Sequence, residues 1–127
     1  MEEENIKSNT ISQQQIQSYM QDENYTIFKA VIEKEIVGFI ILQKTDEINV
    51  DSVVVKREFR NLGIASKLIL KAEKFAKEKD TDVLSLEVSH KNITAYLLYK
   101  KLGFIERRTR KKYYADGSDA IEMFKKI

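Results

Sequence analysis

The 127-residue chain contains no cysteine and no proline, and it has only one histidine, His90, and four glycines. The lack of cysteine excludes disulfide bonds, thiolate metal ligands and a cysteine nucleophile. The single histidine disfavours a histidine-rich metal site and a Ser-His-Asp triad, so we expect His90 in a surface loop. No apolar run reaches about 18 residues and the N-terminus is polar, which predicts no membrane span, no signal peptide and a cytoplasmic location.

The composition predicts one soluble domain over residues 1–127, with a frayed start at residues 1–9. Hydrophobic residues make up 43% of the chain and charged residues 33%, enough for both a core and a polar surface. Charge is divided unevenly: residues 1–50 hold nine acidic and four basic residues, a net of −5, whereas residues 51–127 hold eleven and eighteen, a net of +7. The basic second part indicates an anionic partner, such as nucleic acid, a phosphate-bearing cofactor or an acidic protein.

Hydrophobic periodicity predicts a mixed α/β single domain in which the middle strands can be parallel neighbours joined by right-handed crossovers. Apolar residues at helical spacing predict helices over residues 10–21, 61–78 and 92–102. Alternating or continuous apolar stretches predict strands over residues 25–33, 36–43, 48–55, 82–89, 104–113 and 119–126. Gly103 stands where a helix C-cap belongs, and Asp116-Gly117 marks the last turn.

The apolar pattern slips within the strand predicted over residues 48–55. Ile48 and Val50 share one parity, and Val53 and Val55 share the other. One extra residue near Asp51 and Ser52, a β-bulge, would bring both pairs onto one face. Burial of the strand on both faces is the alternative.

The segment after this strand has the form strand, glycine-containing loop, helix. Such a loop presents backbone N–H groups and the positive end of a helix dipole to an anion, and Gly63 and the small Ala65 would allow a pyrophosphate to approach closely. The segment is neither a Walker P-loop nor a GxGxxG motif. An ordinary strand-to-helix connection with one glycine therefore stays open.

Two further groups of polar residues could carry chemistry. Glu87 lies on the polar side of a predicted strand, where it could be a general base or could simply face solvent or pair with a lysine. Asn92, Tyr96 and Tyr99 share one helix face, where they could bind a ligand or donate a proton. Packing of the two tyrosines in the core, with Asn92 as a helix cap, is the alternative.

A basic run with adjacent aromatic residues follows the last predicted helix. It could contact nucleic acid, or it could be the solvated edge of a strand. Its members are Arg107, Arg108, Arg110, Lys111, Lys112, Tyr113 and Tyr114.

Taken together, these segments resemble the GNAT superfamily of acetyl-CoA-dependent N-acetyltransferases, and within it the bacterial ribosomal-protein alanine N-acetyltransferases. The resemblance runs from about residue 12 to the C-terminus. Arg60-x-x-Gly63-x-Ala65 is similar to the family's acetyl-CoA motif (Q/R)-x-x-G-x-(G/A). Asn92 begins a match to N-x-x-A-x-x-L-Y-x-x-x-G-F, and RKKYYADGSDAIEMFKK resembles the family's C-terminal hairpin.

The resemblance implies a role for each matching residue, with acetyl-CoA as the co-substrate and no metal. Glu87 would be the general base, acting through a water, and Tyr99 the general acid that protonates the departing CoA thiolate. Tyr113 and Tyr114 would line the acceptor site. The residues implied in cofactor binding are Val53, Val54 and Val55 for the pantetheine arm, Asn61, Leu62, Gly63, Ile64, Ala65 and Ser66 for the pyrophosphate, and Asn92.

The acceptor implied by the resemblance is a protein N-terminus, such as that of a ribosomal protein, and the enzyme would be a monomer or a homodimer. In the family a first strand and helix precede the helix that matches residues 10–21, and here at most a stub of strand over residues 5–11 takes their place. This shortens one wall of the acceptor site, which a second chain could complete. The alternatives are a small-amine acetyltransferase acting on a polyamine or an aminoglycoside, a nucleic-acid-binding module without activity, and a degenerate fold used only for binding.

Overall fold

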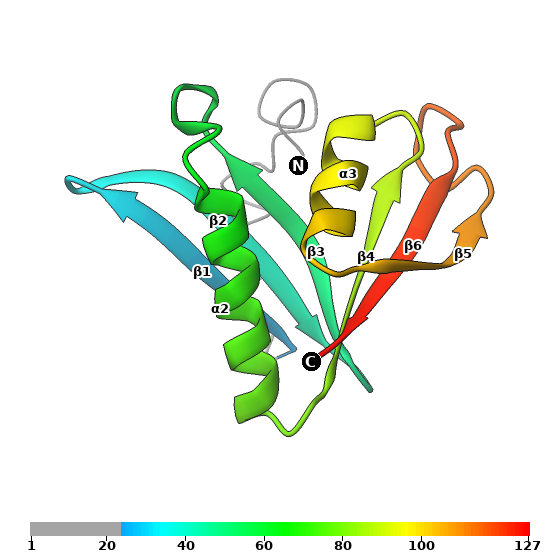
Figure 1. Cartoon of the computed structure of the whole chain (residues 1–127), viewed down its shortest axis with the longest axis horizontal. Helices are drawn as coiled ribbons and strands as arrows, with labels where there is room; N and C mark the ends of the chain where they lie inside the picture. Colours follow the sequence, from blue (N-terminus) through cyan, green and yellow to red (C-terminus); the bar gives the residue numbers. More distant parts are fainter. Residues whose placement is uncertain (1–23) are drawn as a thin grey trace.

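The computed structural model describes residues 24–127 (Figure 1). The frayed start predicted at residues 1–9 and the helix predicted at residues 10–21 lie outside this range. Within it, six strands, two α-helices and one short 3₁₀ helix follow one another. They are β1 (Tyr25–Ile32), β2 (Glu35–Lys44), β3 (Ile48–Val55), η2 (Arg57–Phe59), α2 (Ile64–Glu78), β4 (Val83–Ser89), α3 (Ile93–Lys101), β5 (Ile105–Arg110) and β6 (Ala120–Lys126).

The strands form one mixed sheet in the order β1-β2-β3-β4-β6-β5. Only β3 and β4 pair in parallel, on either side of α2 in the sequence, and the other pairs are antiparallel. This confirms the mixed α/β prediction and the parallel middle pair. The expectation of successive parallel neighbours fails at β5, because β6 returns as a hairpin partner and lies between β4 and β5.

Both α2 and α3 lie on the same face of the sheet, in front of it in Figure 1. The core lies between these helices and the apolar side chains of β2, β3, β4 and β6. α2 packs against β1, β2, β3 and β4, and α3 packs against β4. No helix in residues 24–127 is long and apolar enough to cross a membrane.

The predicted bulge in β3 is present at Asp51. In the register with β2, Leu42 pairs with Val50 and Ile41 pairs with Ser52, so Asp51 has no opposite residue. The bulge brings Ile48, Val50, Val53 and Val55 into the same core cluster, as predicted. The alternative is also correct in part, since Val54 on the opposite face is buried to 8% exposure.

β3 and β4 are paired over only three positions and then diverge. The parallel register runs from Ile48 opposite Leu84 to Val50 opposite Leu86, and no later pair occurs between these strands in the described chain. Figure 1 shows the result as a V between β3 and β4 that opens toward the N-terminal end of α2. The bulge at Asp51 lies at the apex of this V, where it turns β3 away from β4.

Two predicted boundaries are corrected by residues with left-handed backbone conformations. α2 begins at Ile64 rather than at residue 61, because Asn61 and Gly63 have φ values of 64° and 78°. β5 ends at Arg110 rather than at residue 113, because Lys112 has φ 50° and donates its backbone N–H to Asp119 Oδ1 at 3.0 Å. Tyr113 and Tyr114 therefore lie in the β5–β6 loop.

Gly38 allows β2 to approach β3 closely beside the V. A Cβ atom at this position would lie 2.7 Å from the backbone oxygen of Val54. We expect Gly38→Ala to lower the free energy of unfolding by about 1–3 kcal/mol, because the two central strands must separate to admit the methyl group. Chemical denaturation measures this loss, and unchanged stability would contradict the close approach of the two strands.

Candidate active site

The loop before α2 is built to present backbone N–H groups. Gly63 is the N-cap residue of α2 in a left-handed conformation, and no side chain of the described residues caps this helix end. The N–H of Lys67 is bonded to the Gly63 carbonyl, so the first N–H groups of the helix, from Ile64 to Ser66, precede the intrahelical bonds. Nothing lies within 4 Å of the Cβ position of Gly63. This helix end can therefore receive an anionic group at close range.

A pocket connects this loop with β3 and with α3. The loop residues predicted to cradle a pyrophosphate line it, except for Leu62, which is 60% exposed and is not part of the lining. Asn92 is not part of the lining either. The lining residues are Val55, Phe59, Arg60, Asn61, Gly63, Ile64, Ala65, Ser66 and Leu98.

The backbone of β3 is oriented to receive an extended ligand in the V. Lys56 donates its N–H to Val37 O at 2.8 Å, which places this residue pair at a hydrogen-bonded position of the antiparallel ladder. Hydrogen-bonded and non-hydrogen-bonded pairs alternate, so Val54 opposite Phe39 is bonded to β2, whereas Val53 and Val55 are not. The N–H and C=O groups of Val53 and Val55 therefore point away from β2, toward the side from which β4 has diverged.

Glu87 is the first residue of β4 after the last parallel pair, Val50 opposite Leu86. It is half-buried and accepts a hydrogen bond from Asn49 Nδ2 at 3.4 Å, and the same amide group donates to Ser85 Oγ at 3.1 Å. Within residues 24–127, no ion pair joins Glu87 to a lysine. A carboxylate thus lies at the apex of the V.

The surroundings of Glu87 favour its protonated form more than water does. Burial raises the pKa of the Glu87 carboxyl above its ordinary value, and the nearby negative charges of Glu122 and Asp51 add to this effect. The Asn49 hydrogen bond and the positive charge of Arg110 oppose it without reversing it. A carboxyl group with a raised pKa is the more effective general base near neutral pH.

The contacts of the polar residues of α3 include those of the alternative interpretation, a helix cap and a tyrosine packed in the core. Asn92 Oδ1 caps the helix by accepting from the Ala95 N–H at 3.2 Å. The Tyr96 hydroxyl donates to Glu106 Oε2. Tyr99 is 2% exposed and packs edge-to-face on Phe104, with 5.8 Å between ring centroids.

Tyr113 lies in the loop after β5, within electrostatic range of Glu87. Burial raises the pKa of the Tyr113 hydroxyl, and the negative charges of Glu87 and Asp51 add to this effect. Tyr113 and Tyr114 form a T-shaped pair with ring centroids 4.9 Å apart. Tyr113 still exposes 49% of its surface, so an incoming molecule can contact it. As expected, His90 is an exposed loop residue.

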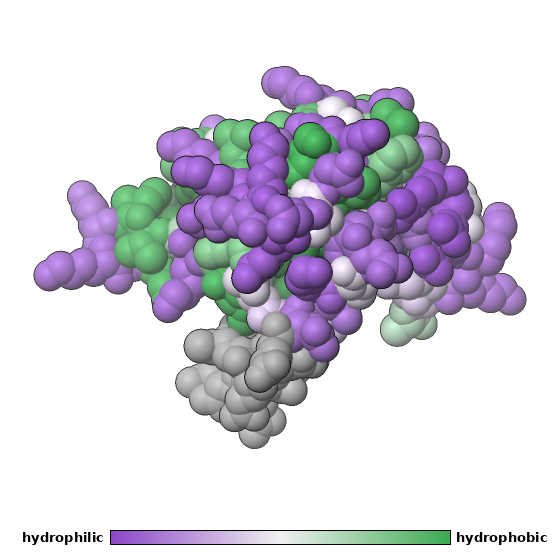
Figure 2. Space-filling view, turned by 90° about the horizontal axis from the view of Figure 1, so that it is seen from below, coloured by the Kyte–Doolittle hydropathy of each residue, from purple (hydrophilic) through white to green (hydrophobic). Residues whose placement is uncertain are grey.

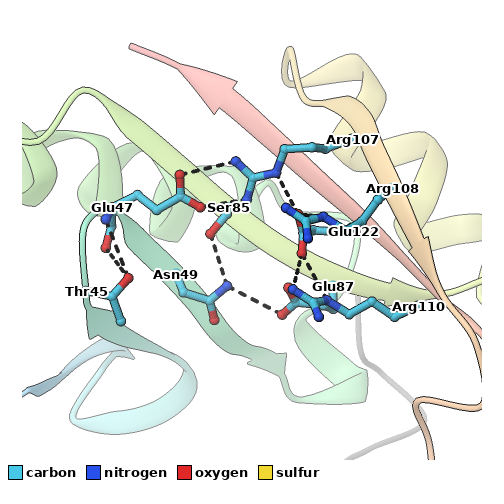
Figure 3. A network of polar contacts seen from close by, with 9 residues as sticks. All are labelled: Thr45, Glu47, Asn49, Ser85, Glu87, Arg107, Arg108, Arg110 and Glu122. Carbon is cyan, nitrogen blue, oxygen red and sulfur yellow. Dashed lines mark hydrogen bonds and ion pairs between the residues drawn. The ribbon is translucent and has the colours of Figure 1, made fainter.

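The sequence pattern did not reveal the partner of the basic run. Three of its arginines bind Glu122 of β6, which is only 1% exposed (Figure 3). The run is therefore neither a plain solvated edge nor a row of cations all directed outward. In an ideal strand, Arg107 would lie on the face opposite to Arg108 and Arg110. A bulge in β5 between Glu106 and Arg108 puts all three arginines on one face, and the sequence pattern gives no sign of this bulge.

A second groove lies on the other side of α2, against the β1–β2 hairpin. It is lined by apolar side chains and three lysines, with no carboxylate, histidine or tyrosine. Figure 2 shows hydrophobic residues at the left end of the molecule, where this hairpin lies, and Val31, Ile32 and Ile36 are exposed there. Residues 24–127 also contain no group of three or more acidic or histidine side chains placed to bind a metal ion. Of these two places, only the V contains a carboxylate that could act in acid–base chemistry.

Comparison with known proteins supports the family predicted from the motifs. The sequence matches the acetyltransferase (GNAT) domain over residues 1–127. An N-alpha-acetyltransferase of Sulfurisphaera tokodaii is 33% identical over 119 residues, covering 83% of this chain and 71% of that protein. More generally, the chain spans between 37% and 71% of the length of the curated relatives it matches.

Solved structures share the fold, and one of them contains acetyl coenzyme A. The ribosomal-protein-S18-alanine N-acetyltransferase of Escherichia coli superimposes with a TM-score of 0.81 at 30% identity, covering 91% of this chain and 77% of that one. A putative streptothricin acetyltransferase from Bacillus anthracis, solved in complex with acetyl coenzyme A, superimposes with a TM-score of 0.79 at 27% identity, covering 87% and 67%. The chain therefore belongs to the GNAT family of acetyl-CoA-dependent N-acetyltransferases, as its sequence motifs predict.

Proposed function

We propose that this chain transfers the acetyl group of acetyl-CoA to the N-terminal α-amine of a protein, with Glu87 as the general base. The position of Glu87 carries the proposal: it is the first residue past the last β3–β4 pair, at the apex of the V. Similar proteins act on such amines, including the S18-alanine enzyme of Escherichia coli and the N-alpha-acetyltransferase of Sulfurisphaera tokodaii. We further propose a cytoplasmic location, which a ribosomal-protein acceptor implies. The enzyme would act as a monomer or a homodimer.

The V and the loop before α2 together fit an extended co-substrate with a pyrophosphate at one end. The backbone groups of Val53 and Val55 would pair with the amides of the pantetheine arm, with Val54 between them. The pyrophosphate would accept from the backbone N–H groups of the loop and of the first turn of α2. The loop residues are Asn61, Leu62, Gly63, Ile64, Ala65 and Ser66, and Asn92 would contribute from the start of α3.

Acetyl transfer requires three proton and charge movements, and we assign a group of this chain to each. Glu87, through a water, takes the proton from the ammonium group so that the neutral amine can attack the thioester carbon. A backbone N–H of the bulged strand β3 stabilises the negative charge that develops on the carbonyl oxygen. As the C–N bond forms and the C–S bond breaks, Tyr99 gives a proton to the sulfur.

Replacement of Tyr99 by phenylalanine tests the proposed acid. We expect Tyr99→Phe to lower kcat by about tenfold or more, because the thiolate then leaves without a proton donor. Tyr96→Phe is the matched control, since it removes the same hydroxyl group from the same helix at a residue directed to Glu106. Initial rates at saturating acetyl-CoA measure both variants, and equal rates for the two would remove Tyr99 from the mechanism.

The acceptor would enter beside Tyr113 and Tyr114, in the loop between β5 and β6. Release of free CoA with a panel of acceptors tests the proposal. The panel contains peptides with a free N-terminal alanine, the same peptides with a blocked N-terminus, a polyamine and an aminoglycoside. We expect turnover only with the free N-termini. Turnover confined to the polyamine or the aminoglycoside would identify a small-amine acetyltransferase, and salt-sensitive binding of nucleic acid without any turnover would identify a binding module.

A further inference from the structure

The buried carboxylate of Glu122 is held by three guanidinium groups. Arg110 donates to Oε1 from Nε at 2.9 Å and from Nη2 at 2.5 Å. Arg107 Nε lies 2.6 Å and Arg108 Nε 3.0 Å from Oε2. Arg107 also bridges to Glu47, with Nη2 at 2.6 Å from Oε1. Both carboxylate oxygens of Glu122 are thus bonded to guanidinium groups (Figure 3). Because this carboxylate is nearly inaccessible to water, these bonds offset the cost of removing its charge from solvent.

This cluster lies directly beside the proposed base. Glu122 of β6 is the antiparallel partner of Glu87 of β4, so the two carboxylates project side by side from neighbouring strands on one face of the sheet. The arginines come from β5, the next strand outward. The strand of Glu122 therefore lies between the strand of Glu87 and the strand that carries the three arginines.

Glu122 determines which carboxylate these cations contact. Glu47, Glu122 and Glu87 carry three negative charges, which balance the three arginines only when all are ionised. If Glu122 lost its charge, Arg110, which already acts electrostatically on Glu87, could turn to this carboxylate on the neighbouring strand. Arg108 and Arg110 are 59% and 44% exposed at their side chains, so they have room to turn. A Glu87 carboxylate paired with arginine would be a weaker base and would not be available to the water that it must activate.

We propose that Glu122 is a positioning residue that binds the three arginines and so keeps the neighbouring Glu87 free to act as the base. This inference rests on the proposed function of Glu87. The charged and titratable groups that face Glu87 are consistent with this. They are Asp51 of β3, Glu122 of β6, Arg110 of β5 and Tyr113 of the β5–β6 loop. Among them only Arg110 is cationic, and it is already bonded to Glu122.

Two substitutions should move the pH dependence of kcat/KM in opposite directions. Glu122→Gln removes a negative charge beside Glu87 and releases the arginines, so we expect the acid limb of the profile to move to lower pH and kcat to fall by about tenfold. Arg110→Gln removes the cation that faces Glu87, so the acid limb should move to higher pH. Glu122→Asp retains the charge and should restore an acid limb close to that of the unmodified enzyme.

Glu73→Gln is the matched control for a purely structural effect. It also removes a largely buried carboxylate from an ion pair, with Lys125 at 2.9 Å, but on α2 and away from the V. We expect it to leave the acid limb in place. If Glu122→Gln does not fold, Arg110→Gln still tests the proposal, because Arg110 is exposed and its replacement should leave folding intact. An acid limb that does not move in Arg110→Gln overturns the proposal.

A double variant separates this inference from the proposed role of Glu87. If Glu122 acts through Glu87, adding Glu122→Gln to Glu87→Gln will not reduce kcat further. An additional tenfold loss in the double variant would overturn the positioning role. Full activity of Glu87→Gln alone would instead overturn the assignment of the base, and absence of acetyl transfer by the unmodified chain would overturn the proposed function.

Discussion

Glu87→Gln is expected to lower kcat by about 10²- to 10⁴-fold while leaving the affinity for acetyl-CoA unchanged. Glutamine keeps the size of the side chain and can still bond to Asn49, but it cannot accept the proton of the attacking ammonium group. The binding elements for the co-substrate, in β3 and before α2, are separate from this side chain. Steady-state rates with an N-terminal peptide and calorimetric titration with acetyl-CoA measure the two quantities.

The pH profile gives a second signature of the same substitution. Glu87 acts as a base only when deprotonated, so activity falls as the pH drops through its pKa, which burial raises above the ordinary carboxyl value. We expect Glu87→Gln to lose this acid limb. Glu78→Gln, at an exposed position near the end of α2, is the control and should keep it. Rates close to those of the unmodified enzyme in Glu87→Gln would refute the assignment of the base.

Gly63→Ala is expected to raise the KM for acetyl-CoA by about tenfold or more. The residue has φ 78°, where an alanine costs roughly 1–2 kcal/mol, and the added methyl group would project into the open space beside the loop. Relaxation of that strain turns the N–H groups at the start of α2 away from the pyrophosphate. The acetyl-CoA dependence of the initial rate measures this effect.

Gly117→Ala supplies a control with the same backbone strain. Gly117 has φ 83° and, like Gly63, has nothing within 4 Å of its Cβ position. Both variants should therefore lose a similar amount of unfolding free energy, but only Gly63→Ala should change the KM for acetyl-CoA. A similar rise of KM in both would mean that general destabilisation, and not the loop before α2, determines the affinity.

Features that depend on local pattern could be predicted from the sequence. The parity slip between Val50 and Val53 predicted a bulge, because only an inserted residue can keep both apolar pairs on the core face. The apolar run ending at Val55, followed by Gly63 and an amphipathic stretch, predicted a strand–loop–helix connection, which is present. The alternative interpretation of the helix over residues 92–102 expected Asn92 as its cap and Tyr99 in the core, and both are present.

Features that depend on pairing between distant segments could not be predicted in this way. Arg107 is out of phase with Arg108 and Arg110 in an ideal strand, and only the β5 bulge against β6 brings the three together. Glu122 looks like a polar residue at a strand position, and its burial follows from three arginines supplied by another strand. The early end of β5 depends on the bond between Lys112 and Asp119, seven residues apart.

The location of acetyl-CoA in the V is the central claim, and residue-resolved amide hydrogen exchange tests it most directly. On addition of acetyl-CoA, we predict slower exchange at Val53 and Val55 and from Asn61 to Ser66. The groove between α2 and the β1–β2 hairpin, represented by the amides of Phe28 and Lys29, should not change. Protection confined to that groove, or no protection in β3 and the loop at saturating acetyl-CoA, would contradict the account.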